Sequence, residues 1–191
     1  WDSLNKGLPA KCIPIRLYLQ GDDVYLSTFS SGIFRLENEK WIDLNSPDFR
    51  RRSIYYSDAG YRKISAFSVD PDDSRNIAVA TKHIIYQSRN GGKSCTAIPM
   101  AGFNKRNYIT ALAVSGKTIY VGTSFNGIFE SSGGEFRPLG KGLPFEPYSA
   151  TLAFTEQLSY IFAGRTELYA GFQFGGGVYY KNNSSKNFSP V

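Results

Sequence analysis

The segment Val24-Tyr25-Leu26-Ser27-Thr28 is the first copy of a pattern that decides the fold. The pattern returns as IAVAT at 77–81, IYVGT at 119–123 and LYAGF at 168–172. Its end moves from residue 28 to residue 172 in three steps, which gives a period of about 48 residues. Self-similarity at such a period indicates a supersecondary unit that is stacked several times, because one unit cannot bury its own apolar face.

Each copy lies inside a longer unit in which the segments follow the same order. An apolar run precedes the pattern, at 15–19, 64–69, 109–114 and 158–163. A small loop and another apolar pair follow it, at 32–34, 84–86, 127–129 and 177–179. A short ending closes each unit, at 41–44, 95–98, 136–139 and 188–191, and a fifth ending stands at 1–4. Short runs rich in β-branched and aromatic residues are typical of strands, so each unit is predicted to contain strands a, b, c and d.

These units predict an all-β fold, a β-propeller of four-stranded blades. The period suits a propeller blade, and no window of the sequence shows an apolar stripe at helical spacing. We expect one propeller domain or partial propeller over 1–191, with four blades at approximately 12–46, 60–100, 107–144 and 150–191. The fifth ending is one d strand too many for a closed four-bladed ring, and an open ring exposes two ends. We therefore expect a segment of a larger propeller of about seven blades, in which 1–4 complete a preceding blade.

The segment Ser88–Cys95, with the sequence SRNGGKSC, contains the sharpest local motif. It resembles the Asp-box of the BNR-repeat β-propellers, whose pattern is Ser-x-Asp-x-Gly-x-Thr-Trp, and 69–77 resembles the a-to-b turn of that family. A short acceptor at the third position can tie the hairpin backbone, and a glycine can adopt a left-handed conformation. Asn90 provides an acceptor without the charge, whereas Cys95 departs from the aromatic residue of the family. The predicted structural box consists of Ser88, Asn90, Gly92, Ser94 and Cys95.

A second resemblance lies in the Gly-Leu-Pro at 7–9 and 142–144, which is similar to blade junctions of bacterial BNR-like and sensor-type propellers. The family includes sialidase-like, sortilin-like and photosystem-assembly-factor-like propellers. The resemblance thus implies a fold that hosts both enzymes and binding scaffolds, and the fold alone does not choose between them.

Topology concentrates the positive charge on one face of the predicted propeller. The d-to-a and b-to-c connections share one face, and the a-to-b and c-to-d turns share the other. The first face sums to about +7 and the second to about −1, whereas the whole chain has a net charge of +6. Arginine beside aromatic residues is typical of protein-binding hot spots. The predicted binding face consists of Arg50, Arg51, Arg52, Tyr55, Tyr56, Arg62, Lys105, Arg106, Phe29, Phe125 and Phe174.

These features favour a non-enzymatic scaffold for a protein or peptide partner with an acidic surface, because a positive face speeds encounter with anionic surfaces. Nucleic acid is not an expected partner, since the sequence has no motif for it. No cofactor or metal is expected. The single histidine, His83, excludes a multi-histidine metal site and leaves little room for a Ser-His-Asp triad. The glycines at 175–177 open no helix that could cradle a phosphate.

The alternative is a carbohydrate-active enzyme, a sialidase or glycosidase whose catalytic groups lie partly outside this segment. The segment Ile13–Arg16 is superficially similar to the arginine-bearing strand of sialidases, but the order of its residues differs. A glycosidase needs two suitably separated carboxyl groups. The acids cluster instead at 22–23 and 70–73, where we interpret them as turn formers. No catalytic residue is assigned, and carbohydrate stays open as a ligand.

Cys12 and Cys95 are expected to be buried free thiols, because each lies at a strand position suited to packing. The sequence contains no apolar stretch of 18 or more residues and no signal peptide. The family resemblance implies a bacterial-type, extracytoplasmic protein, secreted or periplasmic, with a cytoplasmic location left open.

Overall fold

The computed structural model describes residues 3–29, 31–45, 64–100, 107–124, 126–133, 135–143, 158–172, 176–182 and 184–191. Within these residues the secondary structure consists of strands and turns, without a helix. Accordingly, this part of the chain offers no long apolar helix that could cross a membrane.

The strands form four antiparallel sheets of four strands each. Blade 1 contains β1 (Pro14–Gln20), β2 (Asp23–Thr28), β3 (Ile33–Glu37) and β4 (Lys40–Asp43). Blade 2 contains β5 (Ala66–Val69), β6 (Ile77–Ala80), β7 (Ile84–Ser88) and β8 (Thr96–Pro99). Blade 3 contains β9 (Ile109–Ser115), β10 (Thr118–Thr123), β11 (Ile128–Ser131) and β12 (Arg137–Pro138). Blade 4 contains β13 (Leu158–Ala163), β14 (Glu167–Phe172), β15 (Val178–Asn182) and β16 (Ser189–Pro190).

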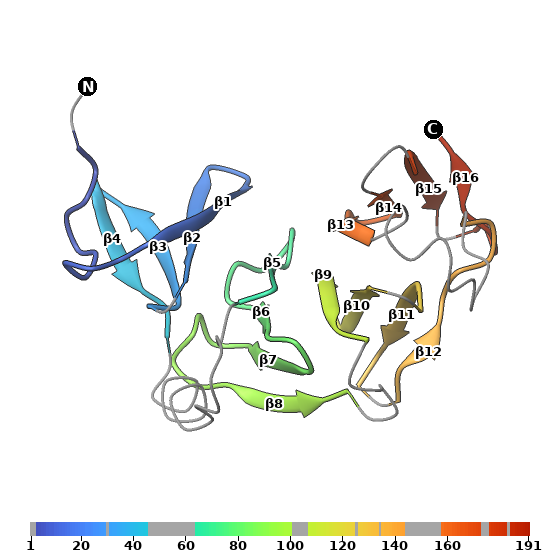
Figure 1. Cartoon of the computed structure of the whole chain (residues 1–191), viewed down its shortest axis with the longest axis horizontal. Coiled ribbons are helices and arrows are strands. Elements are labelled where there is room, and N and C mark those ends of the chain that lie inside the picture. Colours follow the sequence, from blue (N-terminus) through green and yellow to red (C-terminus); the bar gives the residue numbers. More distant parts are fainter. Residues whose placement is uncertain are drawn as a thin grey trace.

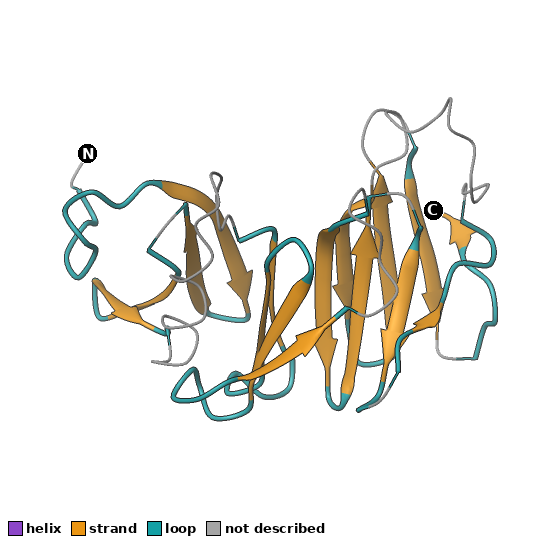
Figure 2. Cartoon of the chain, turned by 60° about the horizontal axis from the view of Figure 1, so that its bottom comes forward, coloured by secondary structure: helices purple, strands orange, loops and turns teal. Residues whose placement is uncertain are grey.

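The four blades lie along an arc that is open on one side (Figure 1). The first strand of each blade is innermost and the last is outermost, and within each sheet the strands pair in chain order. Figure 2 shows the blades standing side by side. The expected all-β architecture, with strands a to d in every unit, is confirmed.

Alternating side chains explain why the sheets stack. In β6, Ile77 and Val79 pack toward blade 1, whereas Ala78 and Ala80 pack toward blade 3. Both sides of this strand are therefore buried, as the short continuous apolar runs predict. Three apolar layers result, one at each junction between consecutive blades. At about 25 cal/mol per Å² of apolar surface, such layers dominate the stability of the stack.

A repeated Lys-Gly-Leu segment, at 6–8 and 141–143, lies along the outermost strand of blade 1 and of blade 4. The backbone N–H of Trp41 donates to the carbonyl of Lys6 at 2.8 Å, and that of Phe188 donates to the carbonyl of Lys141 at 2.8 Å. Gly142 has φ +87°, and a Cβ there would lie 2.1 Å from the Phe188 carbonyl oxygen. A left-handed glycine is thus required where the chain crosses the next blade.

Three of the predicted d-strand endings contain an aromatic residue, Trp41, Phe136 and Phe188. Phe136 packs against the layer between blades 2 and 3, and Phe188 is buried between blades 3 and 4. Trp41 is the exception, because it packs with Leu8 of the segment before β1, and its indole Nε1–H donates to the carbonyl of Leu4 at 2.7 Å. The N-terminal segment takes the place of a neighbouring sheet at the outer part of blade 1.

Neither cysteine forms a disulfide, as expected. The expectation that they are buried is wrong, because each is only half-buried. Partial burial raises the pKa of the Cys12 thiol, and a hydrogen bond with Ser31 opposes that rise. Cys95 packs at the margin of the layer between blades 1 and 2, where the Asp-box of the family has an aromatic residue.

Candidate functional site

Three of the four innermost strands, β1, β9 and β13, have a β-bulge near their first residue. The register of β1 skips between Pro14 and Arg16, and that of β13 skips between Leu158 and Tyr160. In β9, Ile109 pairs with Thr123 and Ala111 pairs with Gly122, so Thr110 is left unpaired. A bulge re-aims a side chain and bends its strand, and bulges are frequent beside binding sites. Three blades thus place one irregular residue at the same level of the arc.

The four innermost strands line a cavity of about 530 Å³ on the inner side of the arc. This volume lies within the range of ligand-binding pockets. Its described lining comes from all four innermost strands and is mainly apolar or aromatic. Arg16, Gln20, Ser68, Thr110 and Ser159 provide the polar groups other than tyrosine hydroxyls.

The polar groups lie largely toward the bulged end of the cavity. Arg16 directly follows the bulge of β1 and is exposed, whereas Thr110 and Ser159 occupy the bulges of β9 and β13. The Thr110 hydroxyl is buried and has no hydrogen-bond partner within the described residues. Burial also raises the pKa of Tyr18, whose phenol therefore stays a neutral donor. The mouth of the cavity presents one guanidinium among hydroxyl and aromatic groups.

The bulged end is also where the b-to-c loops meet the d-to-a connections, and we name it the loop end. Backbone hydrogen bonds join the two kinds of segment there: Phe29 N–H to Ile13 at 2.9 Å, Ile109 N–H to Lys82 at 2.9 Å, and Ser124 N–H to Tyr108 at 3.0 Å. These bonds agree with the prediction that the d-to-a and b-to-c connections share one face of the propeller. Lys11 and Lys82 are exposed on these segments. Lys6 and Lys141 lie elsewhere, beside the outer edges of blades 1 and 4.

Of the predicted binding face, the structure describes Phe29 alone. Phe29 is half-buried at the start of the loop between β2 and β3. The other ten residues lie outside the described residues: Arg50, Arg51, Arg52, Tyr55, Tyr56, Arg62, Lys105, Arg106, Phe125 and Phe174. Their common face therefore stays a prediction.

The opposite end contains the box-like turn, which we name with its neighbours the turn end. Ser88 donates to Asn90 Oδ1 at 3.0 Å, and its Oγ accepts the Gly92 N–H at 2.9 Å. The Ser94 N–H donates to Asn90 Oδ1 at 3.0 Å. Gly92 has φ +87°, and a Cβ there would lie 2.4 Å from the Leu44 carbonyl oxygen of blade 1. Asn90 therefore organises the hairpin as a short acceptor, and Gly92 allows blades 1 and 2 to meet.

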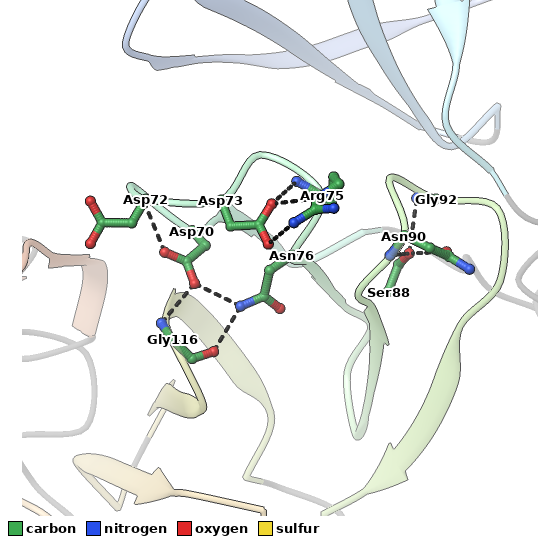
Figure 3. A network of polar contacts seen from close by, with 9 residues as sticks. All are labelled: Asp70, Asp72, Asp73, Arg75, Asn76, Ser88, Asn90, Gly92 and Gly116. Carbon is green, nitrogen blue, oxygen red and sulfur yellow. Dashed lines mark hydrogen bonds and ion pairs between the residues drawn. The ribbon is translucent and has the colours of Figure 1, made fainter.

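A buried carboxylate joins blades 2 and 3 at the turn end (Figure 3). The Gly116 N–H and the Asn76 amide each donate to Asp70 Oδ2 at 2.7 Å, and the Asn76 amide also donates to the Gly116 carbonyl at 2.8 Å. Arg165 of blade 4 donates to Asp72 at 2.6 Å. The acids that we interpreted as turn formers thus also connect one blade to another. Hydrogen bonding from Arg75 lowers the pKa of Asp73 in the same turn.

The cavity mouth was not identified from the sequence. Arg16 was noted only for its similarity to a sialidase strand, and neither Thr110 nor Ser159 was singled out. A usable signal existed, because Thr110 and Ser159 directly follow the first paired residue of β9 and β13, and Arg16 lies one position further along β1. Apolar patterning does not reveal it, since a bulge adds one residue without changing the composition of a strand.

Solved structures with the same arrangement of strands are β-propellers. The chain is 16% identical to the GH74 xyloglucanase from Xanthomonas campestris, with a TM-score of 0.57 over 88% of this chain and 28% of that one. It is 15% identical to YCF48 from Cyanidioschyzon merolae, with a TM-score of 0.59 over 96% and 57%. It is 12% identical to YCF48 bound to a D1 peptide, with a TM-score of 0.61 over 96% and 56%.

A further likeness is to the extracellular domain of a putative one-component system from B. thetaiotaomicron, which is 15% identical with a TM-score of 0.57 over 97% of this chain and 23% of that one. No protein-family model and no curated protein matches the chain. At these identities the likeness establishes the β-propeller fold. The chain spans between about a quarter and somewhat over half of these larger proteins.

Proposed function

We propose that this propeller is a non-enzymatic scaffold that binds an acidic segment of a protein or peptide partner at its loop end, over the mouth of the axial cavity. The observation that supports this proposal most directly is the chemistry of the described lining. It offers the Arg16 guanidinium, neutral hydroxyl groups and aromatic rings, and it contains no Asp, Glu or His among the residues described. In such a lining, the guanidinium attracts a carboxylate, and the aromatic rings offer apolar contacts to the rest of a ligand.

The same chemistry argues against glycoside hydrolysis at this cavity. Retaining and inverting glycosidases use two carboxyl groups on either side of the scissile bond, about 5 to 9.5 Å apart. The described lining provides neither carboxyl group, and Arg16 is its single arginine, whereas a sialidase gathers three. The fold itself accommodates both functions, since a GH74 xyloglucanase and a YCF48 bound to a D1 peptide share it.

Charge supports an acidic partner in particular. In the described segments of the loop end, Lys11 and Lys82 are exposed and form no ion pair. At the turn end, by contrast, acidic and basic residues nearly balance, and Asp72 and Asp73 are paired with arginines. The connection between β4 and β5 adds Arg50, Arg51 and Arg52, and the connection between β8 and β9 adds Lys105 and Arg106. We also propose an extracytoplasmic location, secreted or periplasmic.

The test uses fluorescein-labelled decapeptides of alternating Glu and Val, or of alternating Lys and Val, and measures fluorescence anisotropy. We expect the acidic peptide to bind, with an affinity that falls as salt rises, because the Debye length shrinks from about 10 Å at 0.1 M to about 3 Å at 1 M. Reversal of Arg50, Arg51 and Arg52 to Glu should weaken binding at least tenfold, chiefly through slower association. Arg16→Glu should weaken it by a similar factor. Arg89→Glu, at the turn end, is the matched control.

Equal binding of both peptides, or an unchanged affinity in the loop-end variants, would contradict the proposal. The rival function has its own assay, release of reducing sugar from xyloglucan and of sialic acid from a sialoside. Turnover that is lost in Arg16→Gln and kept in Arg89→Gln would place an enzyme at this cavity and overturn the proposal.

A further inference from the structure

The chain contains two Asn-Gly pairs, Asn90-Gly91 and Asn126-Gly127, and they lie at opposite ends of the blades. The first pair is in the box-like turn of blade 2, at the turn end. The second pair is in the loop between β10 and β11 of blade 3, at the loop end. In this dipeptide the backbone nitrogen of glycine can approach the side-chain carbon of asparagine, because glycine has no Cβ that would hinder it. The contacts of each pair therefore decide whether its asparagine reacts with its own backbone.

Hydrogen bonds hold every reacting group of the first pair. Asn90 Oδ1 accepts from the Ser88 hydroxyl and from the Ser94 N–H, each at 3.0 Å. Asn90 Nδ2 donates to Ser94 Oγ at 2.8 Å. The Gly91 N–H donates to the Arg75 carbonyl at 2.9 Å. The side-chain amide and the backbone nitrogen are thus fixed to different partners, and neither is free to turn toward the other.

The second pair is held at its flanks, and its reacting groups are free. The Asn126 N–H donates to Thr123 Oγ1 at 3.0 Å. The Gly127 carbonyl accepts from the Thr123 N–H at 3.0 Å and from the Thr123 hydroxyl at 3.1 Å. Asn126 is exposed, and among the described residues neither its side-chain amide nor the Gly127 N–H has a hydrogen-bond partner. Gly127 has φ +77°, and a Cβ there would meet no atom within 4 Å, so the space beside its backbone is open.

We propose that Asn126 is a site of spontaneous deamidation and that the hydrogen bonds of the box-like turn protect Asn90 from the same reaction. The Gly127 nitrogen attacks Cγ of Asn126 and forms a C–N bond, and the side-chain amide group leaves as ammonia with the proton of the Gly127 nitrogen. Water then opens the resulting succinimide ring at either of its carbonyl groups. The product is an aspartate or an isoaspartate at position 126, and the net reaction consumes one water and releases one ammonia.

This reaction changes the charge of the loop end. The loop that contains Asn126 joins the neighbouring d-to-a connection, since the Ser124 N–H donates to the Tyr108 carbonyl at 3.0 Å. A carboxylate in this loop lowers the positive potential of the proposed binding face and weakens its attraction for an acidic segment. This consequence rests on the proposed function, whereas the reaction itself does not. Deamidation of Asn126 thus acts as a slow and irreversible reduction of the affinity for an acidic partner.

The experiment follows both asparagines in one sample of the 191-residue chain. The protein is kept in a mildly alkaline buffer for several days, because base removes the proton of the attacking nitrogen. Its proteolytic peptides are then separated by chromatography, which resolves aspartate from isoaspartate, and are identified by mass spectrometry. We expect Asn126 to react faster than Asn90 by at least a factor of about ten, because Asn90 must first break its bonds with Ser88 and Ser94.

Two variants separate the effect of the structure from that of the dipeptide. Asn126→Gln should stop the reaction at position 126, because the longer side chain forms a ring far more slowly. The double variant Ser88→Ala, Ser94→Ala should speed the reaction at Asn90 and leave the rate at Asn126 unchanged. The comparison of the two asparagines in the wild type stands even where this double variant does not fold.

The labelled peptide of alternating Glu and Val measures the effect on binding. Asn126→Asp should weaken its binding by a factor of about two to five, which is the size expected for one exposed charge. Asn126→Gln should bind the peptide as the wild type does. Asn90→Asp is the matched control, because it introduces the same charge at the turn end.

Equal rates at the two asparagines, a faster reaction at Asn90, or an Asn126 that stays unmodified would overturn the proposal. A wild type that does not bind the acidic peptide would overturn the proposed function and leave the deamidation site standing. If the wild type binds and Asn126→Asp has the same affinity, the regulatory consequence is wrong. The two proposals therefore fail separately.

Discussion

The junction between blades 1 and 2 and the junction between blades 2 and 3 are built in different ways. In the first, Tyr18 and Tyr25 pack on Phe67, with ring centroids 5.0 and 5.5 Å apart. In the second, Ala66, Ala78 and Ala80 face the aliphatic side chains of blade 3. Small side chains let innermost strands approach closely, whereas rings on both sides keep them apart. The volume of the side chains at each junction thus sets the spacing between one blade and the next.

Close approach also brings polar groups within reach of each other. The Ser68 hydroxyl accepts the Val114 N–H at 3.0 Å, near the middle of the junction between blades 2 and 3. The Asp70 carboxylate accepts a hydrogen bond from the Gly116 N–H at the turn end. The backbone carbonyl of Lys82 accepts one from the Ile109 N–H at the loop end. The second junction therefore combines apolar burial with directional bonds along its length. This comparison predicts different responses to substitution at the two junctions.

The largest effect is expected at the aromatic junction. Phe67→Ala should lower the free energy of unfolding by about 4 kcal/mol, because it removes a buried ring and the partner of Tyr18 and Tyr25. In a Trp1→Phe background, Trp41 fluorescence reports on blade 1. Its urea transition should separate from that of the far-UV circular dichroism, since blade 1 loses its main contact. Phe67→Leu should cost less than half as much, and coincident transitions in Phe67→Ala would contradict the view that this ring couples blades 1 and 2.

The next effect is expected at the hydrogen-bonded junction. Asp70→Ala should cost about 3 kcal/mol, because it leaves the buried Asn76 amide and the Gly116 N–H without their acceptor. Urea denaturation followed by circular dichroism measures this change. The control is Asp73→Ala in the same turn, whose pair with Arg75 is exposed to solvent, so its loss should cost much less than the loss of Asp70. Similar losses in both variants would show that Asp70 is only a turn former.

A smaller effect should follow from enlarging a side chain at the second junction. Ala78→Leu should cost about 2 kcal/mol, because Ala78 is completely buried where blades 2 and 3 approach closely. Ala10→Leu, at an exposed position, should change thermal stability by less than about 0.5 kcal/mol. If Ala78→Leu is as stable as the wild type, side-chain volume does not set the spacing at this junction.

The smallest effect depends on pH and concerns the first junction. Burial, with the nearby Asp23, raises the pKa of Tyr25 from 10.0 to about 12. The folded state therefore favours the neutral phenol, and this contribution is complete below pH 10 and is lost as the pH rises through about 12. The free energy of unfolding should fall over this window, and Tyr25→Phe should reduce the fall. Tyr160→Phe, which alters an exposed ring, should leave it unchanged.

The sequence predicted the strands because their signals are local. The repeat of Val24–Thr28 located every b strand, and turn residues located the ends. The sequence did not predict that the N-terminal segment covers Trp41. A d-strand ending has the same composition whether a sheet or a loop packs on it. Nor did it show that the cysteines are half-buried, because burial depends on the neighbouring blade.

For the candidate site, the sequence indicated which end of the blades collects the d-to-a and b-to-c connections, because strand order fixes the two ends. The cavity mouth at Arg16, Thr110 and Ser159 was missed, because these residues are far apart in the chain and converge only around the axis. The network at Asp70 was interpreted as a turn for a similar reason. Its acceptor role depends on Gly116, which lies 46 residues away.

The sequence by itself determined the all-β class, the repeat and the order of the strands, since alternation and turn chemistry act within a few residues. The tertiary structure alone decided which faces are buried, where polar groups gather and how closely consecutive blades approach. Those properties depend on side-chain volumes that meet across blades, as Tyr18 meets Phe67, and no local pattern encodes such a contact.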